Sequence, residues 1–299
     1  ISMSEYSTFE PRVASRSSQH SIRGVTYHVN EWGSADSPLL VFLHGGGDAG
    51  LTYQFVVDAL QKDWHVVAPD WRGFGRSPLR AAAYGFPDYL ADLDQLLDHY
   101  SPDEPVRLVG HSMGANVAGL YSGVRPERVC AFVNIEGFGL VDSEPADAPA
   151  HYADWLEKSR NLPRYGRFES FDALAEHLQR RSPRMGAARA GFVARAWATA
   201  GPGRLELRAD PAHKLPNPVL YRRAEAEACW RNVTAPVLLV AGRESNILEA
   251  FAEHVEEGNL ELPFPDSRTS VIADAGHMIH FEAPERLAQV IERFLEPTL

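Results

Sequence analysis

The chain alternates between short apolar runs and longer segments in which apolar residues recur at helical spacing. Runs rich in valine, leucine and isoleucine, or alternating between polar and apolar residues, predict strands. The expected strands cover residues 26–32, 39–43, 65–69, 107–109, 130–135, 236–240 and 269–272. The first of them alternates and is expected to be antiparallel, whereas the central ones are rich in apolar residues, as in strands buried on both faces. The pattern predicts an α/β fold with a mostly parallel sheet.

Two segments show the helical pattern most clearly. In residues 87–100, Leu90, Leu93, Leu96 and Leu97 form one apolar stripe, and aspartates occupy the other face. In residues 284–295, apolar residues recur at the same spacing. Both segments are expected to pack one face against the sheet.

The alternation is interrupted once, between residues 139 and 234. No strand-like run occurs there, and stretches with helical patterning at 150–160 and 171–180 indicate a helical insertion. Prolines at 211, 216 and 218 predict a rigid loop that returns toward the sheet. The predicted organisation is a core domain of residues 1–138 and 235–299, with a helical cap of residues 139–234.

Charge and composition exclude several classes of protein. Of the 299 residues, 44% are hydrophobic, which is typical of a folded globular chain. The net charge of −11 disfavours binding to nucleic acid or to an anionic membrane surface. The first twenty residues contain no continuous apolar stretch, and no run is long enough to span a bilayer. A cytoplasmic protein that acts on a small molecule is therefore expected.

No metal or cofactor site is expected. Cys130 and Cys229 have no ligand spacing and are interpreted as free thiols. His277 and His280 lie three residues apart, but the sequence places no carboxylate or cysteine beside them in a metal-binding pattern.

The strand at 107–109 leads into the segment Gly110-His111-Ser112-Met113-Gly114 and then into a helical pattern. A turn this tight strains the backbone at the serine and leaves no room for side chains two residues on either side of it. Strand, G-x-S-x-G and helix therefore predict a nucleophile elbow that presents the Ser112 hydroxyl above the sheet.

With this motif the chain resembles the α/β-hydrolase superfamily, and in particular its members with a helical cap inserted after the sixth strand. Three further motifs carry the resemblance: HGGG at 44–47, DWRGFGRS at 70–77 and Gly276-His277 after the last strand. The resemblance implies that His277 is the base that accepts the Ser112 proton. It also implies that the backbone N–H groups of Gly46 and Met113 form the oxyanion hole.

The catalytic acid departs from the family pattern. Where the family usually reads Gly-x-x-Asp after the seventh strand, this chain has Gly242-Arg243-Glu244-Ser245. Two carboxylates could replace the missing aspartate. Glu136, at the end of the sixth strand, occupies a position at which some superfamily members keep their acid, and it is the preferred candidate. Glu244 is the alternative, because its longer side chain could reach the imidazole from one residue earlier.

A serine nucleophile favours acyl transfer, so the predicted activity is hydrolysis of a carboxylic ester through an acyl-Ser112 intermediate. A carbon–carbon bond hydrolase, a lactonase or a thioesterase would use the same residues, and a small-molecule receptor on a hydrolase fold is a further alternative. Six aromatic residues of the cap are expected to supply an apolar lid, although most of them could equally pack the cap against the sheet: Tyr152, Trp155, Phe192, Trp197, Tyr221 and Trp230.

Overall fold

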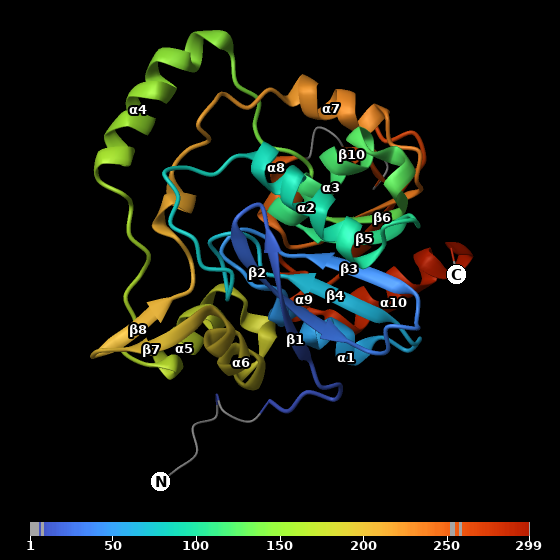
Figure 1. Ribbon diagram of the computed structural model, residues 1–299, viewed down its shortest axis with the longest axis horizontal. Coiled ribbons are helices and arrows are strands. Elements are labelled where there is room, and N and C mark those ends of the chain that lie inside the picture. The colour runs from blue at the N-terminus through green and yellow to red at the C-terminus, as the bar shows by residue number, and fades with distance from the viewer. Residues whose placement is uncertain (1–5, 7–8, 252–254, 257–258, 299) are drawn as a thin grey trace.

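The computed structural model describes residues 6, 9–251, 255–256 and 259–298, and its centre is one eight-stranded sheet (Figure 1). The strands lie in the order β1-β2-β4-β3-β5-β6-β9-β12. All neighbours from β4 to β12 are parallel, and β1 and β2 form an antiparallel edge. The strands are β1 (Arg16–Ile22), β2 (Val25–Trp32), β3 (Leu39–Leu43), β4 (His65–Pro69), β5 (Val106–His111), β6 (Val129–Ile135), β9 (Val237–Gly242) and β12 (Ser267–Ile272).

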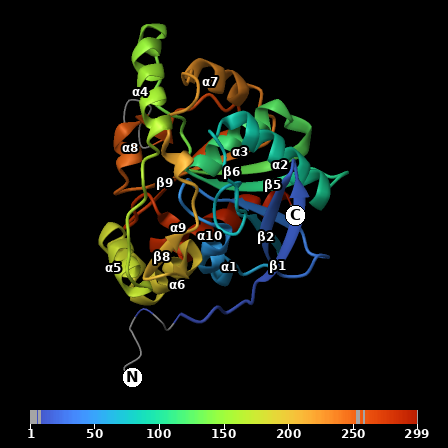
Figure 2. The ribbon, with the colours of Figure 1, turned by 60° about the vertical axis from the view of Figure 1, so that its left-hand side comes forward.

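Helices cover both faces of this sheet, and shorter elements complete the fold (Figures 1 and 2). The helices are α1 (Gln54–Ala59), α2 (Phe86–Tyr100), α3 (Met113–Val124), α4 (Ala148–Arg160), α5 (Phe171–Arg181), α6 (Ala187–Trp197), α7 (Arg223–Arg231), α8 (Asn246–Ala250), α9 (Ile279–Glu282) and α10 (Pro284–Leu295). Two short strand pairs are β7 (Ala198–Gly201) with β8 (Arg204–Leu207), and β10 (Val255–Glu256) with β11 (Asn259–Leu260).

The alternation of side chains along the strands divides the core into two layers. In β3, Val41 and Leu43 pack on the face covered by α2, α3 and α7, whereas Leu40 and Phe42 pack on the face covered by α1 and α10. Successive side chains of a strand point to opposite faces, so an apolar run such as residues 39–43 fills both layers. The predicted α/β fold with a mostly parallel sheet is confirmed.

Strand β1 was not expected from the sequence. Its residues are largely polar, and only Ile22, at its end, is buried. The strand lies at the edge of the sheet, pairing with β2 alone, so one side of its backbone faces away from the sheet. An edge strand with little burial leaves no apolar alternation for a sequence to display.

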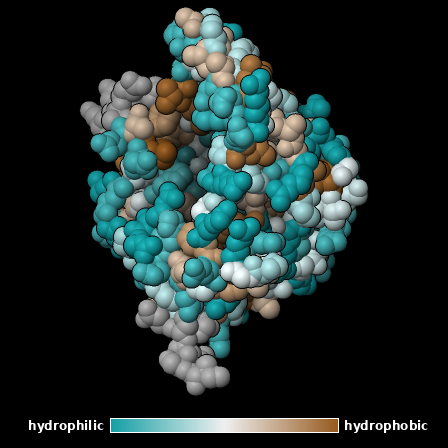
Figure 3. Space-filling view, turned by 90° about the vertical axis from the view of Figure 1, so that its left-hand side faces the viewer, coloured by the Kyte–Doolittle hydropathy of each residue, from teal (hydrophilic) through white to brown (hydrophobic). Residues whose placement is uncertain are grey.

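The segment from 139 to 234 contains α4, α5, α6 and α7, together with one feature that corrects the sequence analysis. The expectation that this segment has no strand is wrong, because β7 and β8 form a short antiparallel hairpin. Helices α5 and α6 pack together in a hydrophobic cluster that also includes Phe55 of α1 and Phe281 of α9. Helix α4 stands out from the body of the molecule and has no buried residue (Figure 2). Figure 3 shows this side of the molecule, with apolar patches near the protruding helix on a largely hydrophilic surface.

None of the helices within the described residues has the length and apolar character needed to cross a membrane.

Candidate active site

Three neighbouring parallel strands end at the same level and bring the predicted site residues to one edge of the sheet. His111 of β5 is paired with Ile135 of β6, and Ile135 is paired with Val240 of β9. Ser112 directly follows His111, and Glu136 directly follows Ile135. The backbone N–H of Ser112 donates a hydrogen bond to the carbonyl of Ile135, and that of Glu136 donates to the carbonyl of Val240, so both residues continue the pairing of the strands. The carboxyl ends of parallel strands are where α/β proteins bind ligands.

Ser112 has the strained backbone expected of a nucleophile elbow. It lies between β5 and α3 with φ 51° and ψ −116°, in a region that residues other than glycine rarely adopt. A side chain at Gly110 would overlap the backbone of Ala115, and one at Gly114 would overlap the carbonyl oxygens of Leu43 and His44. The sharp turn therefore requires glycine at both positions.

Glu136 contacts His277 directly. Its Oε2 lies 2.5 Å from Nδ1 of His277, and its Oε1 accepts a hydrogen bond of 2.8 Å from the backbone N–H of Gly242. The carboxylate is fully buried, and Glu136 itself has a strained φ of 54°. Because a carboxylate at Nδ1 holds the ring proton there, Nε2 of His277 remains free to act as a base. The hydrogen bonds of the described residues include none between His277 and Ser112, and such bonds are often long before substrate binds.

Ser245 is a part of this arrangement that sequence reasoning missed. Its Oγ donates a hydrogen bond of 2.7 Å to Oε2 of Glu136, the oxygen that also contacts His277. Ser245 occupies the position at which the family usually has its aspartate, and here its hydroxyl bonds the carboxylate of Glu136 instead. The only signal in the sequence was that missing aspartate.

We predict that Ser245→Ala lowers kcat about 10-fold and leaves KM unchanged. The variant removes a hydrogen bond to a buried carboxylate, and such bonds contribute about 1.5–3 kcal/mol. Steady-state ester hydrolysis measures both constants. Ser101→Ala is the matched control, because that hydroxyl bonds only the carbonyl of Glu104 at the surface. Since Ser245 also accepts a bond from the N–H of Ile247, a melting curve must accompany the kinetics. An unchanged kcat in folded Ser245→Ala would exclude a role in positioning Glu136.

The alternative acid, Glu244, points elsewhere. Its carboxylate forms a 2.5 Å ion pair with Arg184, and its side chain is about half exposed. The structure thus brings Glu136, and not Glu244, to His277.

Gly46 and Met113, the expected oxyanion donors, lie beside Ser112 in the wall of one cavity. A Cβ atom at Gly46 would be 3.9 Å from the Met113 sulfur. Met113 is the first residue of α3, where backbone N–H groups have no partner within the helix. Two N–H groups close to a nucleophile are what a developing oxyanion requires.

His44 holds the glycine-rich loop in place. Its Nε2 accepts a hydrogen bond of 2.9 Å from the backbone N–H of Trp71, so the ring proton is on Nδ1, which donates to the carbonyl of Gly45 at 2.7 Å. Complete burial lowers the pKa of His44, which keeps the ring neutral. The 44–47 loop is thereby tied to the 70–77 segment.

His280 has a carboxylate partner that the sequence spacing did not indicate. Asp48, which follows the glycine-rich loop, places Oδ2 2.9 Å from Nε2 of His280. The two residues are 232 positions apart, so local spacing could not reveal the pair.

The cavity that contains Ser112 has a volume of about 400 Å³, within the usual range for small-molecule sites. Its wall contains no lysine, arginine, aspartate or glutamate among the described residues. The His213 ring is stacked between Phe74 and Tyr84, with centroids 3.7 Å from each. Burial lowers the pKa of His213 to about 4, so this wall is uncharged at neutral pH.

The apolar lid predicted from six cap aromatics needs correction. None of the six lines this cavity within the described chain; the segment 139–234 contributes other residues, including Leu140, Tyr165 and His213. Trp230 is fully buried and stacks on Phe264, and Trp197 donates a 2.8 Å hydrogen bond to Asp48. Tyr152 is exposed on α4.

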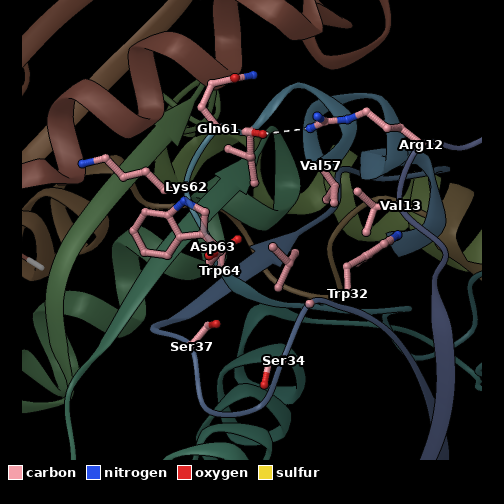
Figure 4. A pocket seen from close by; sticks show the side chains of 13 residues that line it. Arg12, Val13, Trp32, Ser34, Ser37, Val57, Gln61, Lys62, Asp63 and Trp64 are labelled. Atoms are coloured by element: carbon pink, nitrogen blue, oxygen red, sulfur yellow. Dashed lines mark hydrogen bonds between the residues drawn. The ribbon is translucent and has the colours of Figure 1, made fainter.

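A second cavity lies at the opposite end of the sheet. It has a volume of about 550 Å³ and is lined by residues near the amino ends of β3 and β4, among them Lys62, Asp63 and Trp64 (Figure 4). Arg12 closes one side by donating a hydrogen bond to the carbonyl of Leu60. Since Ser112 lies at the carboxyl ends of the strands, this cavity is remote from the candidate active site.

The fold and the arrangement around Ser112 define a class of protein. The model of the alpha/beta hydrolase fold family matches residues 38–284, and the chain belongs to that family and is a hydrolase. Among curated proteins, a 3-hydroxybutyrate-oligomer hydrolase of Cupriavidus necator is 30% identical, over 88% of this chain and 90% of the relative. A 2-(acetamidomethylene)succinate hydrolase of Mesorhizobium japonicum is 27% identical, over 91% of this chain and 92% of the relative.

Solved structures agree on the fold. The thioesterase domain from the curacin biosynthetic pathway superimposes with a TM-score of 0.82 at 23% identity, covering 94% of this chain and 99% of that domain. At this identity the likeness concerns the fold.

Proposed function

We propose that the protein hydrolyses carboxylic esters whose acyl and alcohol groups are uncharged and largely apolar. The observation that carries the proposal is the contact of the buried Glu136 carboxylate with Nδ1 of His277, next to a strained Ser112. A serine hydroxyl is a weak nucleophile unless a base accepts its proton, and this contact leaves Nε2 of His277 for that purpose.

The proposed reaction has two steps. Ser112 Oγ attacks the ester carbonyl carbon, its proton passes to Nε2 of His277, and the N–H groups of Gly46 and Met113 stabilise the oxyanion. The tetrahedral intermediate expels the alcohol, which takes the proton from His277, and an acyl-Ser112 ester remains. A water molecule then attacks this ester, with His277 again accepting and returning a proton, and the carboxylic acid leaves.

The uncharged wall of the cavity favours an uncharged ester over the substrate named for the Mesorhizobium relative. A substituted succinate carries carboxylates, which in an enclosed site require cationic partners. The described wall of this cavity offers aromatic rings, neutral His213 and the amides of Asn116 and Asn217. The name of the Cupriavidus relative points the same way, because the units of a hydroxy-acid oligomer are joined by ester bonds.

We predict that kcat/KM for p-nitrophenyl hexanoate exceeds that for the p-nitrophenyl monoester of adipic acid by about 100-fold. The two substrates have six-carbon acyl chains and the same leaving group, but the second ends in a carboxylate that would lose its hydration without gaining a partner. Initial rates of p-nitrophenol release, corrected for spontaneous hydrolysis, measure the ratio. A preference for the charged ester would instead favour a carboxylate-bearing substrate and the carbon–carbon bond hydrolase alternative.

A further inference from the structure

Asn116 is a buried amide in the wall of the candidate active-site cavity. Its backbone N–H donates a hydrogen bond of 2.9 Å to the carbonyl of Ser112, so the two residues lie about one helical turn apart at the start of α3. Only 8% of Asn116 is exposed, and both residues line the same cavity. The side chain of Asn116 therefore lies close to the place where an ester carbonyl would react.

The contacts of Asn116 fix the direction of its amide. Its Oδ1 accepts a hydrogen bond of 2.9 Å from the backbone N–H of Gly139. Because a backbone N–H can only donate, the oxygen of the amide must face Gly139, and the NH₂ group must face away from it. One side of the amide is thus held by the backbone, and the other side presents two N–H donors.

The NH₂ group of Asn116 has no partner within the described part of the chain. Nδ2 makes no hydrogen bond to these residues, yet it is not among their polar atoms that are sealed from solvent, so it opens into the cavity. Any substrate that fills the cavity excludes water from this group, and an N–H donor left without a partner weakens binding. Asn217, the other amide of the wall, is only half-buried, so a bound substrate can leave it hydrated.

We propose that Asn116 sets the specificity of the site by donating a hydrogen bond to a second, uncharged oxygen of the substrate. The preferred substrates are then esters with an ether or carbonyl oxygen a few atoms from the reacting carbonyl. This inference rests on the proposed function, because Asn116 acts on the substrate that Ser112 attacks.

The rest of the wall makes the position of that oxygen important. Most of the wall is apolar or aromatic, with Phe86, Leu140 and Leu215 among its residues. An oxygen held against such a surface loses its hydration without gaining a partner. An oxygen within reach of the Asn116 amide exchanges its hydration for a hydrogen bond to the protein.

The first test uses three analogues of p-nitrophenyl hexanoate in which an ether oxygen replaces the methylene at chain position 3, 4 or 5. Each kcat/KM is divided by the rate constant for hydrolysis of the same ester by hydroxide, which removes differences in intrinsic reactivity. In the wild type, one analogue should exceed the other two by about 10-fold, because only its oxygen meets the Asn116 amide. Equal corrected values for the three analogues would overturn the proposal.

The variant Asn116→Asp tests whether the amide is responsible for this preference. A carboxylate oxygen can still accept from the N–H of Gly139, but the NH₂ donor is lost. The ratio of the favoured analogue to the hexanoate should fall about 10-fold, and taking the ratio within one protein cancels any general loss of rate. Asn161→Asp is the matched control, because it adds the same charge at the exposed end of α4 and should keep the wild-type ratio. An unchanged ratio in folded Asn116→Asp would contradict the assignment.

A binding measurement on unaltered protein separates this inference from the proposed function. The p-nitroanilides of the same four acids keep each chain and replace the ester by a more stable amide. In ¹⁵N-labelled wild type, one of the ether anilides should shift the side-chain NH₂ resonances of Asn116 further than the hexanoyl anilide does. Shifts no larger than those with the hexanoyl anilide would overturn the proposal, whether or not Asn116→Asp folds. If the larger shift appears but no ester is hydrolysed, the binding role of Asn116 stands and the proposed function fails.

Discussion

Replacement of Ser112 by alanine is expected to reduce kcat for ester hydrolysis by about 10⁶-fold, because the group that attacks the ester is removed. The remaining activity would come from substrate binding and the oxyanion donors alone. Alanine can occupy the same strained backbone as serine, so the fold should persist. Initial rates with p-nitrophenyl hexanoate measure the loss.

Ser122→Ala is the matched control for this prediction. Ser122 is buried in α3, and its hydroxyl bonds the carbonyl of Ala118 within the same helix. This variant should keep kcat within about 2-fold, because the bond it removes lies away from Ser112. Turnover that survives in Ser112→Ala would assign the nucleophile to another residue.

The second large effect concerns the acid. Glu136→Gln is expected to lower kcat by about 10⁴-fold, as an amide at this position no longer stabilises the positive charge on His277 and can hold the wrong tautomer. Glu244→Gln, which alters only a surface ion pair with Arg184, should change kcat by about 2-fold at most. The reverse ranking in steady-state kinetics would identify Glu244 as the acid.

The position of Ser245 allows a rescue of the lost acid. In the double variant Glu136→Ser with Ser245→Asp, the carboxylate moves to the position at which the family usually has it, and a hydroxyl takes its former place. We expect this exchange to recover part of the activity that Glu136→Ser alone loses. If a folded double variant recovers no activity, a carboxylate at position 245 cannot replace the one at position 136.

Local chemistry explains why the nucleophile elbow could be predicted from the sequence. The requirement for glycine at 110 and 114 arises from contacts that any strand-turn-helix of this sharpness makes. The apolar strand β3 was equally clear, because burial on both faces leaves only apolar residues in it.

The acid could not be chosen from the sequence because β6 and β9 are neighbours in the sheet, so both strand ends reach the region of His277. The choice depends on tertiary contacts. Glu136 receives hydrogen bonds from Gly242 and Ser245, whereas Arg184, sixty residues from Glu244, holds that side chain at the surface.

The residues of the cavity wall could not be predicted either, because they are also brought together by tertiary contacts. The stack of Phe74, His213 and Tyr84 joins the 70–77 segment to the proline-rich loop at 211–218, and neither stretch indicates the other. The pair of Asp48 and His280 is a further example, since it joins the loop after β3 to helix α9, 232 residues further along the chain. Contacts of this kind depend on the completed fold.

The most direct test of the proposed serine hydrolase is to determine the intact mass of the protein after rapid acid quenching during turnover of p-nitrophenyl hexanoate. Wild type should gain the mass of one hexanoyl group, located on the peptide that contains Ser112, and Ser112→Ala should gain none. An equal gain in both proteins, or turnover of the ester by wild type without any acyl adduct on Ser112 at any quench time, would contradict the acyl-Ser112 mechanism.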